Sequence, residues 1–76
     1  MKAVLTVIGK DKVGIIAGVS QLLAELDINI LDVSQTIMEE YFTMMMLLSM
    51  EANADFETIR EQLHTKGETL GVKISI

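Results

Sequence analysis

The spacing of the apolar residues switches repeatedly between a strand pattern and a helix pattern, and the order of these switches constrains the fold strongly. Residues 2–9, KAVLTVIG, are apolar on both faces, which is typical of a central strand. The following residues predict a helix over about 14–26, because one apolar stripe recurs at helical spacing: Ile15, Val19, Leu22, Leu23 and Leu26. The chain therefore begins with a strand that leads into a helix.

Two further strand patterns follow, over residues 28–38 and 41–50. In the second, alternate residues form the expected core face: Phe42, Met44, Met46, Leu48 and Met50. The two segments meet near Glu39 and Glu40, which favours a hairpin. Because this pair lacks the Gly or Asn that two-residue hairpin loops prefer, we expect a longer loop or a strand boundary shifted by one residue.

A second helix is predicted over residues 54–66. Asn53 or Asp55 is expected to cap its N-terminus, and Gly67 stands where a C-terminal cap belongs. Its apolar stripe is narrow and consists of Phe56, Ile59 and Leu63. The last segment, LGVKISI, predicts a strand whose inward residues are Val72, Ile74 and Ile76.

These elements follow one another in the order β-α-β-β-α-β, without linkers or low-complexity tracts. This order predicts an α+β fold of the ferredoxin-like type: one four-stranded antiparallel sheet with two helices on one face, in a single domain over residues 1–76. A core of this size rarely supplies more than about 3–5 kcal/mol of stability, and the chain has no cysteine for a disulfide. We therefore expect a homo-oligomer.

Composition argues against several classes of partner. The net charge of −5 disfavours a nucleic-acid partner, because proteins that bind phosphate backbones carry basic faces. No apolar stretch approaches the ~20 residues of a membrane span, and the apolar run at the start ends too early for a signal peptide. We expect a cytoplasmic protein with no membrane or nucleic-acid partner.

Catalytic and metal chemistry find little support in the sequence. Gly9 and Gly14 have the spacing of a phosphate-binding loop, but Ile15 and Ile16 follow where that motif needs Lys and Ser or Thr. The only histidine is His64, on the predicted second helix, and no cysteine is present. We expect neither an enzyme nor a resident metal or cofactor. A divalent cation held across subunits by Asp11, Asp32 and Glu39 or Glu40 remains a minor alternative.

The junction between the first strand and the first helix offers a binding site of a physical kind. A helix that begins near Gly14 leaves its first N–H groups unpaired, and Asp11 is an acceptor just ahead of them. Together they would hold a zwitterion, with its carboxylate on the N–H groups and its ammonium on Asp11. In the competing interpretation Asp11 caps the helix and Gly14 permits close helix–strand packing; residue chemistry alone favours this second interpretation.

Two stretches resemble the ACT domain family: DKVGIIAGVSQLLAELDINILDVSQTI and YFTMMMLLSM. The chain is most similar to small stand-alone bacterial ACT proteins, and to the regulatory domains of formyltetrahydrofolate deformylase and the glycine-cleavage repressor. The resemblance implies regulation rather than catalysis, with a small ligand, often an amino acid, bound between paired domains. The binding positions that it implies are Asp11, Val13, Gly14, Ile15 and Asn29. Many amino-acid sensors of the family differ here by having Asn in place of Asp11 and Pro in place of Val13.

The predicted fold separates Asp11 from Asn29 within one chain. Asp11 follows the first strand and Asn29 begins the second, and these strands run in the same direction, so the two residues lie roughly 20 Å or more apart. If the second strand is an edge that pairs antiparallel with its copy, the partner subunit's Asn29 comes to the Asp11 end. We therefore expect a homodimer through the second strand and first helix, with contributions from Leu31, Val33 and Ile37.

The sequence thus predicts a regulatory protein that binds a small ligand at a subunit boundary and acts on an unknown protein partner in trans. The alternative is an interaction or assembly module without a small ligand. The sequence leaves open the choice between dimer and tetramer, and the roles of Asp32 and Gln35.

Overall fold

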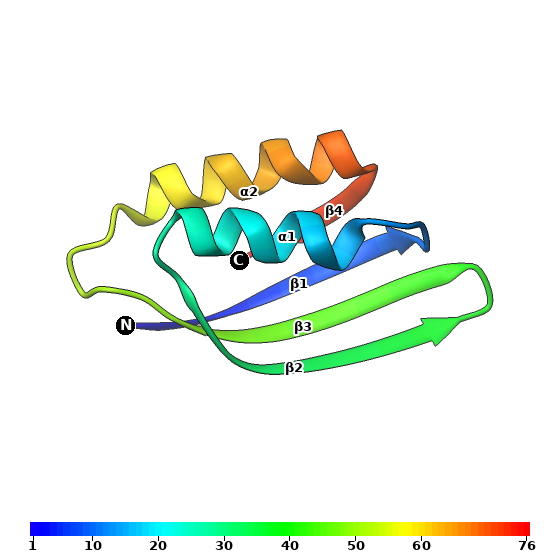
Figure 1. Cartoon of the computed structure of the whole chain (residues 1–76), viewed down its shortest axis with the longest axis horizontal. Helices are drawn as coiled ribbons and strands as arrows, with labels where there is room; N and C mark the ends of the chain where they lie inside the picture. Colours follow the sequence, from blue (N-terminus) through cyan, green and yellow to red (C-terminus); the bar gives the residue numbers. More distant parts are fainter.

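A computed structural model describes residues 1–76 and has the predicted β-α-β-β-α-β order (Figure 1). The elements are β1 Lys2–Lys10, α1 Ile15–Glu25, β2 Asn29–Met38, β3 Tyr41–Ser49, α2 Phe56–Leu70 and β4 Val72–Ser75. All strand pairs are antiparallel. The predicted fold class, a ferredoxin-like sandwich, is confirmed.

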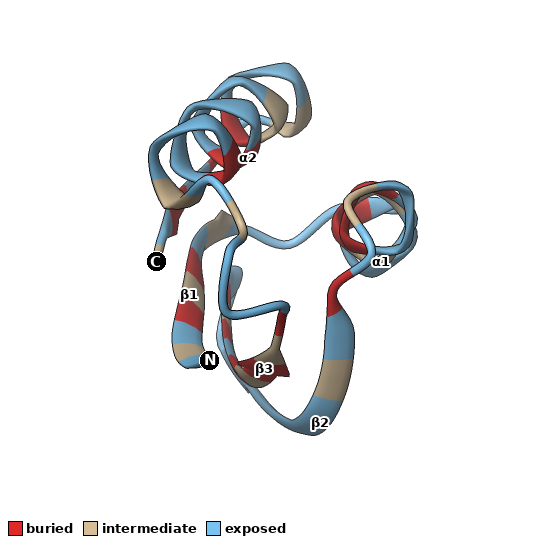
Figure 2. Ribbon diagram, turned by 90° about the vertical axis from the view of Figure 1, so that its left-hand side faces the viewer, coloured by how far each residue is buried: buried red, intermediate tan, exposed pale blue.

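The strands are ordered β2-β3-β1-β4 across the sheet, so β1 is a central strand as predicted and β2 is an edge. Both helices lie on one face of the sheet. Figure 2 shows α1 on the side of β2, and α2 on the side of β1. The opposite face of the sheet carries no helix, and this arrangement leaves both the β2 edge and one whole sheet face open.

The core lies between the helices and the sheet and confirms the predicted faces. The side chains that alternate along β3 onto the predicted face are buried, as are Leu5 and Val7 of β1. The apolar stripe of α1 is also buried, apart from Leu26, which is half-buried. No polar or charged side chain is buried, so the core is held by apolar packing alone.

The β2–β3 hairpin is tighter than the sequence predicts. Met38 pairs with Tyr41, so Glu39 and Glu40 form a two-residue loop between strands that end and begin where predicted. The expectation of a longer loop or a boundary shifted by one residue is therefore wrong. Glu39 adopts the left-handed backbone itself, with φ 55°. That conformation favours Gly or Asn, but the register of two long strands fixes the loop length and an exposed Glu adopts the turn.

The end of α2 also differs from the prediction. The helix continues through Gly67 to Leu70, and Gly71 is the C-cap, with φ 74°. Gly67 is instead buried inside the helix, where a Cβ atom would lie 2.8 Å from the carbonyl oxygen of Val72. The glycine that permits close packing against β4 and the glycine that ends the helix are therefore two different residues.

At the start of α2, Asp55 rather than Asn53 is the N-cap. Its carboxylate accepts hydrogen bonds from the Thr58 hydroxyl at 2.7 Å and from the Thr58 backbone N–H at 3.3 Å. These bonds favour the ionised form and hold the pKa of Asp55 below its ordinary value, with the hydroxyl as the larger cause. The cap defines where the helix begins.

Candidate ligand site at the start of α1

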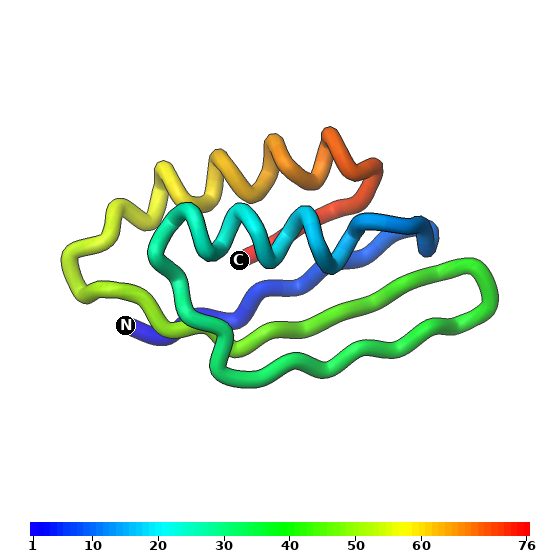
Figure 3. Tube along the Cα trace, in the orientation of Figure 1, coloured from blue at the N-terminus to red at the C-terminus, as the bar shows by residue number.

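The loop between β1 and α1 is attached to the β2–β3 hairpin. The backbone N–H of Asp11 donates a 2.9 Å hydrogen bond to the carbonyl oxygen of Glu40. Lys10 Nζ lies 3.9 Å from Glu40 Oε2 in an exposed ion pair. Figure 3 shows the loop and the hairpin turn at the same end of the molecule. The residues ahead of α1 are therefore held next to the end of β2.

The N-terminus of α1 has no side-chain cap. Gly14 is the N-cap residue, in the left-handed conformation with φ 95°. A Cβ atom built on Gly14 would meet nothing within 4 Å. The interpretation in which Asp11 caps the helix and Gly14 permits close packing is therefore wrong: Gly14 provides a backbone conformation, and the space above it is open.

The partial positive charge at the N-terminus of α1 has no acidic side chain near it within the helix. The first turn of α1 contains no acidic residue, so the partial positive charge of its N–H groups meets no carboxylate within the turn. Asp11 and Val13 are exposed, while the side chain of Ile15 is buried in the core. Of the candidate residues at this end, Ile15 therefore offers only its backbone to a ligand.

Asn29 lies at the opposite end of the sheet. It pairs with Ser49, which in turn pairs with Lys2 at the start of β1. Asp11 follows Lys10 at the end of the same strand. Eight residue steps at about 3.3 Å separate the two ends by roughly 26 Å. One chain therefore brings Asp11 and Gly14 together and does not bring Asn29 to them.

The side of the molecule formed by α1 and β2 carries exposed apolar residues. They are Ile16 in the first turn of α1 and Leu31, Val33 and Ile37 on β2. Leu31 lies at an irregularity in the β2–β3 register, between Ile30 and Asp32. Ile16 was not among the residues expected to contribute. The sequence contained one indication of its exposure: Ile16 follows Ile15 directly and falls outside the apolar stripe that is buried.

The two residues of β2 whose roles the sequence leaves open lie on different faces. Asp32 pairs with Leu47 and Gln35 with Met44, and both are exposed. The Asp32 carboxylate accepts a 2.9 Å hydrogen bond from the backbone N–H of Val33. Because Met44 belongs to the helix-covered face, Gln35 is on the same side of the sheet as α1, and Asp32 is on the open side.

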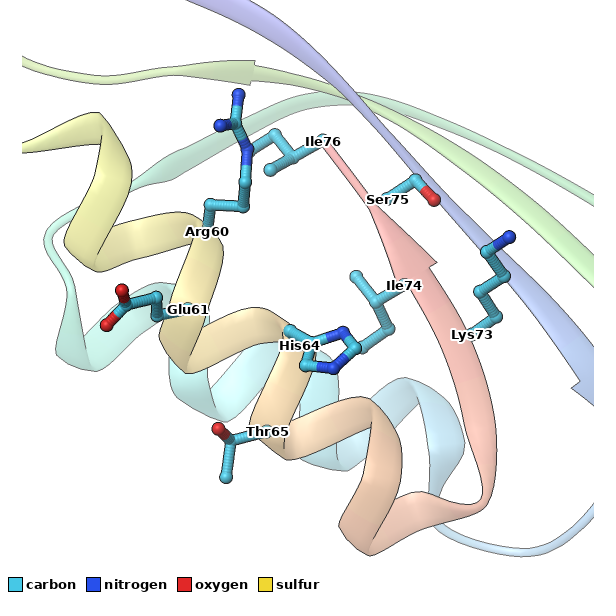
Figure 4. A pocket seen from close by; sticks show the side chains of 8 residues that line it. All are labelled: Arg60, Glu61, His64, Thr65, Lys73, Ile74, Ser75 and Ile76. Atoms are coloured by element: carbon cyan, nitrogen blue, oxygen red, sulfur yellow. The ribbon is translucent and has the colours of Figure 1, made fainter.

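A groove of about 630 Å³ lies between α2 and β4 (Figure 4). Arg60 and His64 lie along it, and Figure 4 shows Lys73 directed away from the helix. Both of these side chains lie near a carboxylate on the same helix: Arg60 Nη1 is 2.8 Å from Glu57 Oε1, and His64 Nε2 is 3.8 Å from Glu68 Oε1.

No three His, Cys, Asp or Glu side chains lie close enough together to hold a metal ion. Neither helix is long and apolar enough to span a membrane.

The chain is similar to known proteins over its full length. The ACT domain family model matches residues 2–76. A UPF0237 protein of Clostridium acetobutylicum is 61% identical over 77 residues, which is 100% of this chain and 86% of that protein. Among solved structures, an ACT domain protein from Streptococcus pneumoniae has a TM-score of 0.91 and 53% identity, over 99% of this chain and 85% of that one.

A formyltetrahydrofolate deformylase from Pseudomonas putida KT2440 has a TM-score of 0.88 at 16% identity, over 99% of this chain and 28% of that one. At this identity the likeness shows the fold alone. The matches to the family model and to the close relatives rest instead on sequence along the whole chain. They confirm the resemblance to the ACT domain family that the sequence shows over residues 11–37 and 41–50. The chain belongs to the ACT domain family.

Proposed function

We propose that this protein is a non-catalytic regulatory ACT protein, which binds a small ligand at a homodimer interface and acts on a partner protein in trans. The observation that carries the proposal is the juxtaposition of an uncapped helix N-terminus at Gly14 with the end of an unpaired edge strand. The Asp11–Glu40 hydrogen bond holds these two features together.

The β2 edge supports the homodimer. Its ten residues present unpaired backbone groups along one side, and such an edge is a template for pairing with another strand. Ile16, Val33 and Ile37 add exposed apolar surface on α1 and β2. Antiparallel pairing of two β2 strands about a two-fold axis near Val33 covers this surface and places the partner subunit's Asn29 beside Met38.

Met38 lies next to the turn that holds Asp11, so this pairing gives each Asp11 loop an asparagine from the other chain. The N–H groups at the start of α1 then donate to a carboxylate, the Asp11 carboxylate accepts from an ammonium group, and the asparagine amide orients a further polar group. The ligand class that fits these three groups is a zwitterion, with free amino acids as the first candidates.

Thermal melting with each of the twenty amino acids tests the proposal. A ligand at 100 times its Kd adds about 2.7 kcal/mol, which for a domain of this size raises Tm by roughly 10 °C or more. Asp11→Ala is expected to abolish the shift, whereas Glu61→Ala, an exposed carboxylate on α2, keeps it. A panel without any shift, together with an Asp11→Ala variant that matches the parent, contradicts ligand binding.

An assembly module without a ligand is the second candidate, and the exposed apolar side of α1 and β2 favours it independently. It predicts a homodimer whose dissociation constant is the same with and without amino acids. The ligand-binding protein is instead expected to dimerise more tightly when its ligand is present, because the ligand contacts both chains only in the dimer.

A further inference from the structure

The side chain of Lys12, in the loop before α1, lies against the end of α2. A Cβ atom built on Gly71 would lie 2.5 Å from Lys12 Nζ and 3.1 Å from Lys12 Cε, so the ammonium group rests on the glycine that ends the helix. Figure 1 shows the end of α2 and the loop before α1 at the same end of the molecule. Gly71 therefore does more than adopt a left-handed backbone, because any side chain at this position would displace the lysine.

The end of α2 attracts a cation and has none of its own. The last carbonyl groups of a helix carry partial negative charge, and the last turn of α2 contains no basic residue. Glu68 adds an acidic side chain to that turn. Lys12 thus supplies, from another part of the chain, the positive charge that favours a helix C-terminus.

Packing between the two helices brings the loop to this place. A Cβ atom built on Gly18 of α1 would lie 3.1 Å from the side chain of Leu70, the last residue of α2. The start of α1 therefore passes the end of α2 at close range. The loop before α1 is held on two sides, by the Asp11 backbone at the β2–β3 hairpin and by the Lys12 side chain at α2.

Asp11 lies between two lysines in sequence, and both lysines are directed elsewhere. Lys10 Nζ lies 3.9 Å from Glu40 Oε2, and Lys12 Nζ lies at the end of α2. None of the ion pairs in the structure includes Asp11. A carboxylate flanked by two lysines is thereby left without a counter-charge and is available to a cationic group from outside.

We propose that Gly71 is a positioning residue of the candidate ligand site, which acts by giving the Lys12 ammonium a place at the end of α2 and so keeps it away from Asp11. The inference rests on the proposed function and explains how the site selects an ammonium group. A lysine released into the loop has a flexible four-carbon stem, so it would pair with the adjacent Asp11 and repel the ammonium group of a ligand.

NMR of the ligand-free parent tests the placement of the lysine. The ε protons of Lys12 are expected to show a nuclear Overhauser effect to the α protons of Gly71, because these two groups are in contact. The ε protons of Lys10, whose side chain lies at Glu40, are the control and are expected to show none. If the Lys12 effect is absent as well, the proposal is overturned whether or not a ligand binds.

Gly71→Asn tests the consequence for binding. Asparagine tolerates the left-handed backbone, and its side chain takes the place of the Lys12 ammonium. The variant is expected to lose most of the Tm shift that the parent shows in the panel of twenty amino acids. Adding Lys12→Met is expected to restore the shift, because no released cation then competes for Asp11. Adding Lys73→Met, which removes an exposed lysine of β4, is the matched control and is expected to restore nothing.

The outcomes separate this inference from the proposed function. A parent without any Tm shift overturns both. If the parent and Gly71→Asn shift equally, the ligand site stands and the role of Gly71 is overturned. If neither double variant regains the shift, the substitution has damaged the helix end rather than released the lysine, and the role of Gly71 is overturned again.

Measurements on Lys12 decide the question if Gly71→Asn fails to fold. Lys12→Met alone is expected to keep the Tm shift, and the Overhauser effect between Lys12 and Gly71 is expected to persist in the parent saturated with the amino acid that gives the largest shift. Loss of the shift in Lys12→Met, or loss of the effect on saturation, shows that the lysine moves to the ligand and overturns the proposal.

Discussion

The backbone N–H of Asp11 donates to the carbonyl oxygen of Glu40 at 2.9 Å, and this bond connects the loop before α1 to the turn after β2. A ligand that orders the loop therefore also acts on the end of the strand that we propose to form the dimer interface. Ligand binding and dimerisation then favour one another, since each orders the same turn.

Replacing the Asp11 side chain is expected to separate ligand binding from folding. The hydrogen bond to Glu40 uses the backbone, so Asp11→Ala keeps it and changes the free energy of unfolding by no more than about 0.5 kcal/mol. The same variant loses the Tm shift with amino acids. Urea denaturation measures the first effect, and melting curves with ligand measure the second. A large loss of stability contradicts the open, exposed position of this carboxylate.

Gly14→Ala is expected to destabilise the fold although nothing lies near the new Cβ atom. The backbone at Gly14 is left-handed with φ 95°, and that conformation costs an L-residue about 1–2 kcal/mol. Urea denaturation at fixed chain concentration measures the loss as a lower midpoint with an unchanged slope. Gln21→Ala, on the exposed side of α1, is the control and is expected to stay within about 0.5 kcal/mol of the parent.

Gly67→Ala tests the contact between α2 and β4. Helix propensity alone predicts a gain of about 1 kcal/mol from this change. The structure predicts a net loss of about 1–3 kcal/mol instead, because the new methyl group would lie 2.8 Å from the carbonyl oxygen of Val72, a backbone atom that does not rotate away. Gln62→Ala, at an exposed position of the same helix, is the control and is expected to stay within about 0.5 kcal/mol of the parent. A stabilised Gly67→Ala variant contradicts the close packing.

The Asp55 cap predicts a pH dependence. Because the folded-state pKa is lowered, the cap stabilises the fold fully above the unfolded value of about 3.9 and loses this effect as the pH falls through the folded value. Asp55→Ala is expected to melt below the parent at neutral pH, and the difference in Tm is expected to shrink below about pH 4. Melting curves from pH 7 downward measure it. A Tm difference that is constant with pH shows that the Thr58 bonds do not depend on the charge.

Much of the fold follows from sequence because alternation and helical spacing identify the buried faces directly. The local details that could not be predicted depend on neighbours that are distant in sequence. Gly67 was predicted to end the second helix because glycine is a frequent C-terminal cap, and only the path of β4 shows that it is a packing position and that Gly71 ends the helix. Glu39 occupies a left-handed turn position that usually holds Gly or Asn, because the pairing of β2 with β3 fixes the loop at two residues.

The candidate site was predictable only in part. Asp11 and Gly14 stand close together in sequence, so their shared position before α1 could be expected. Their capping interpretation failed because Gly14, rather than Asp11, occupies the N-cap position. Asn29 lies at the far end of the sheet, and the role that we propose for it depends on a second copy of the chain. Ile16 was missed because the helical stripe is complete without it.

A mixing experiment tests most directly whether two chains share the ligand site. Asp11→Ala and Asn29→Ala each damage both sites of a homodimer, but a mixed dimer keeps one site with both residues intact. Titration with the amino acid that gives the largest melting shift is expected to show little binding by either variant alone, and binding by about a quarter of the sites after unfolding and refolding an equal mixture. A mixture that binds no more ligand than the separate variants contradicts a site built from two chains.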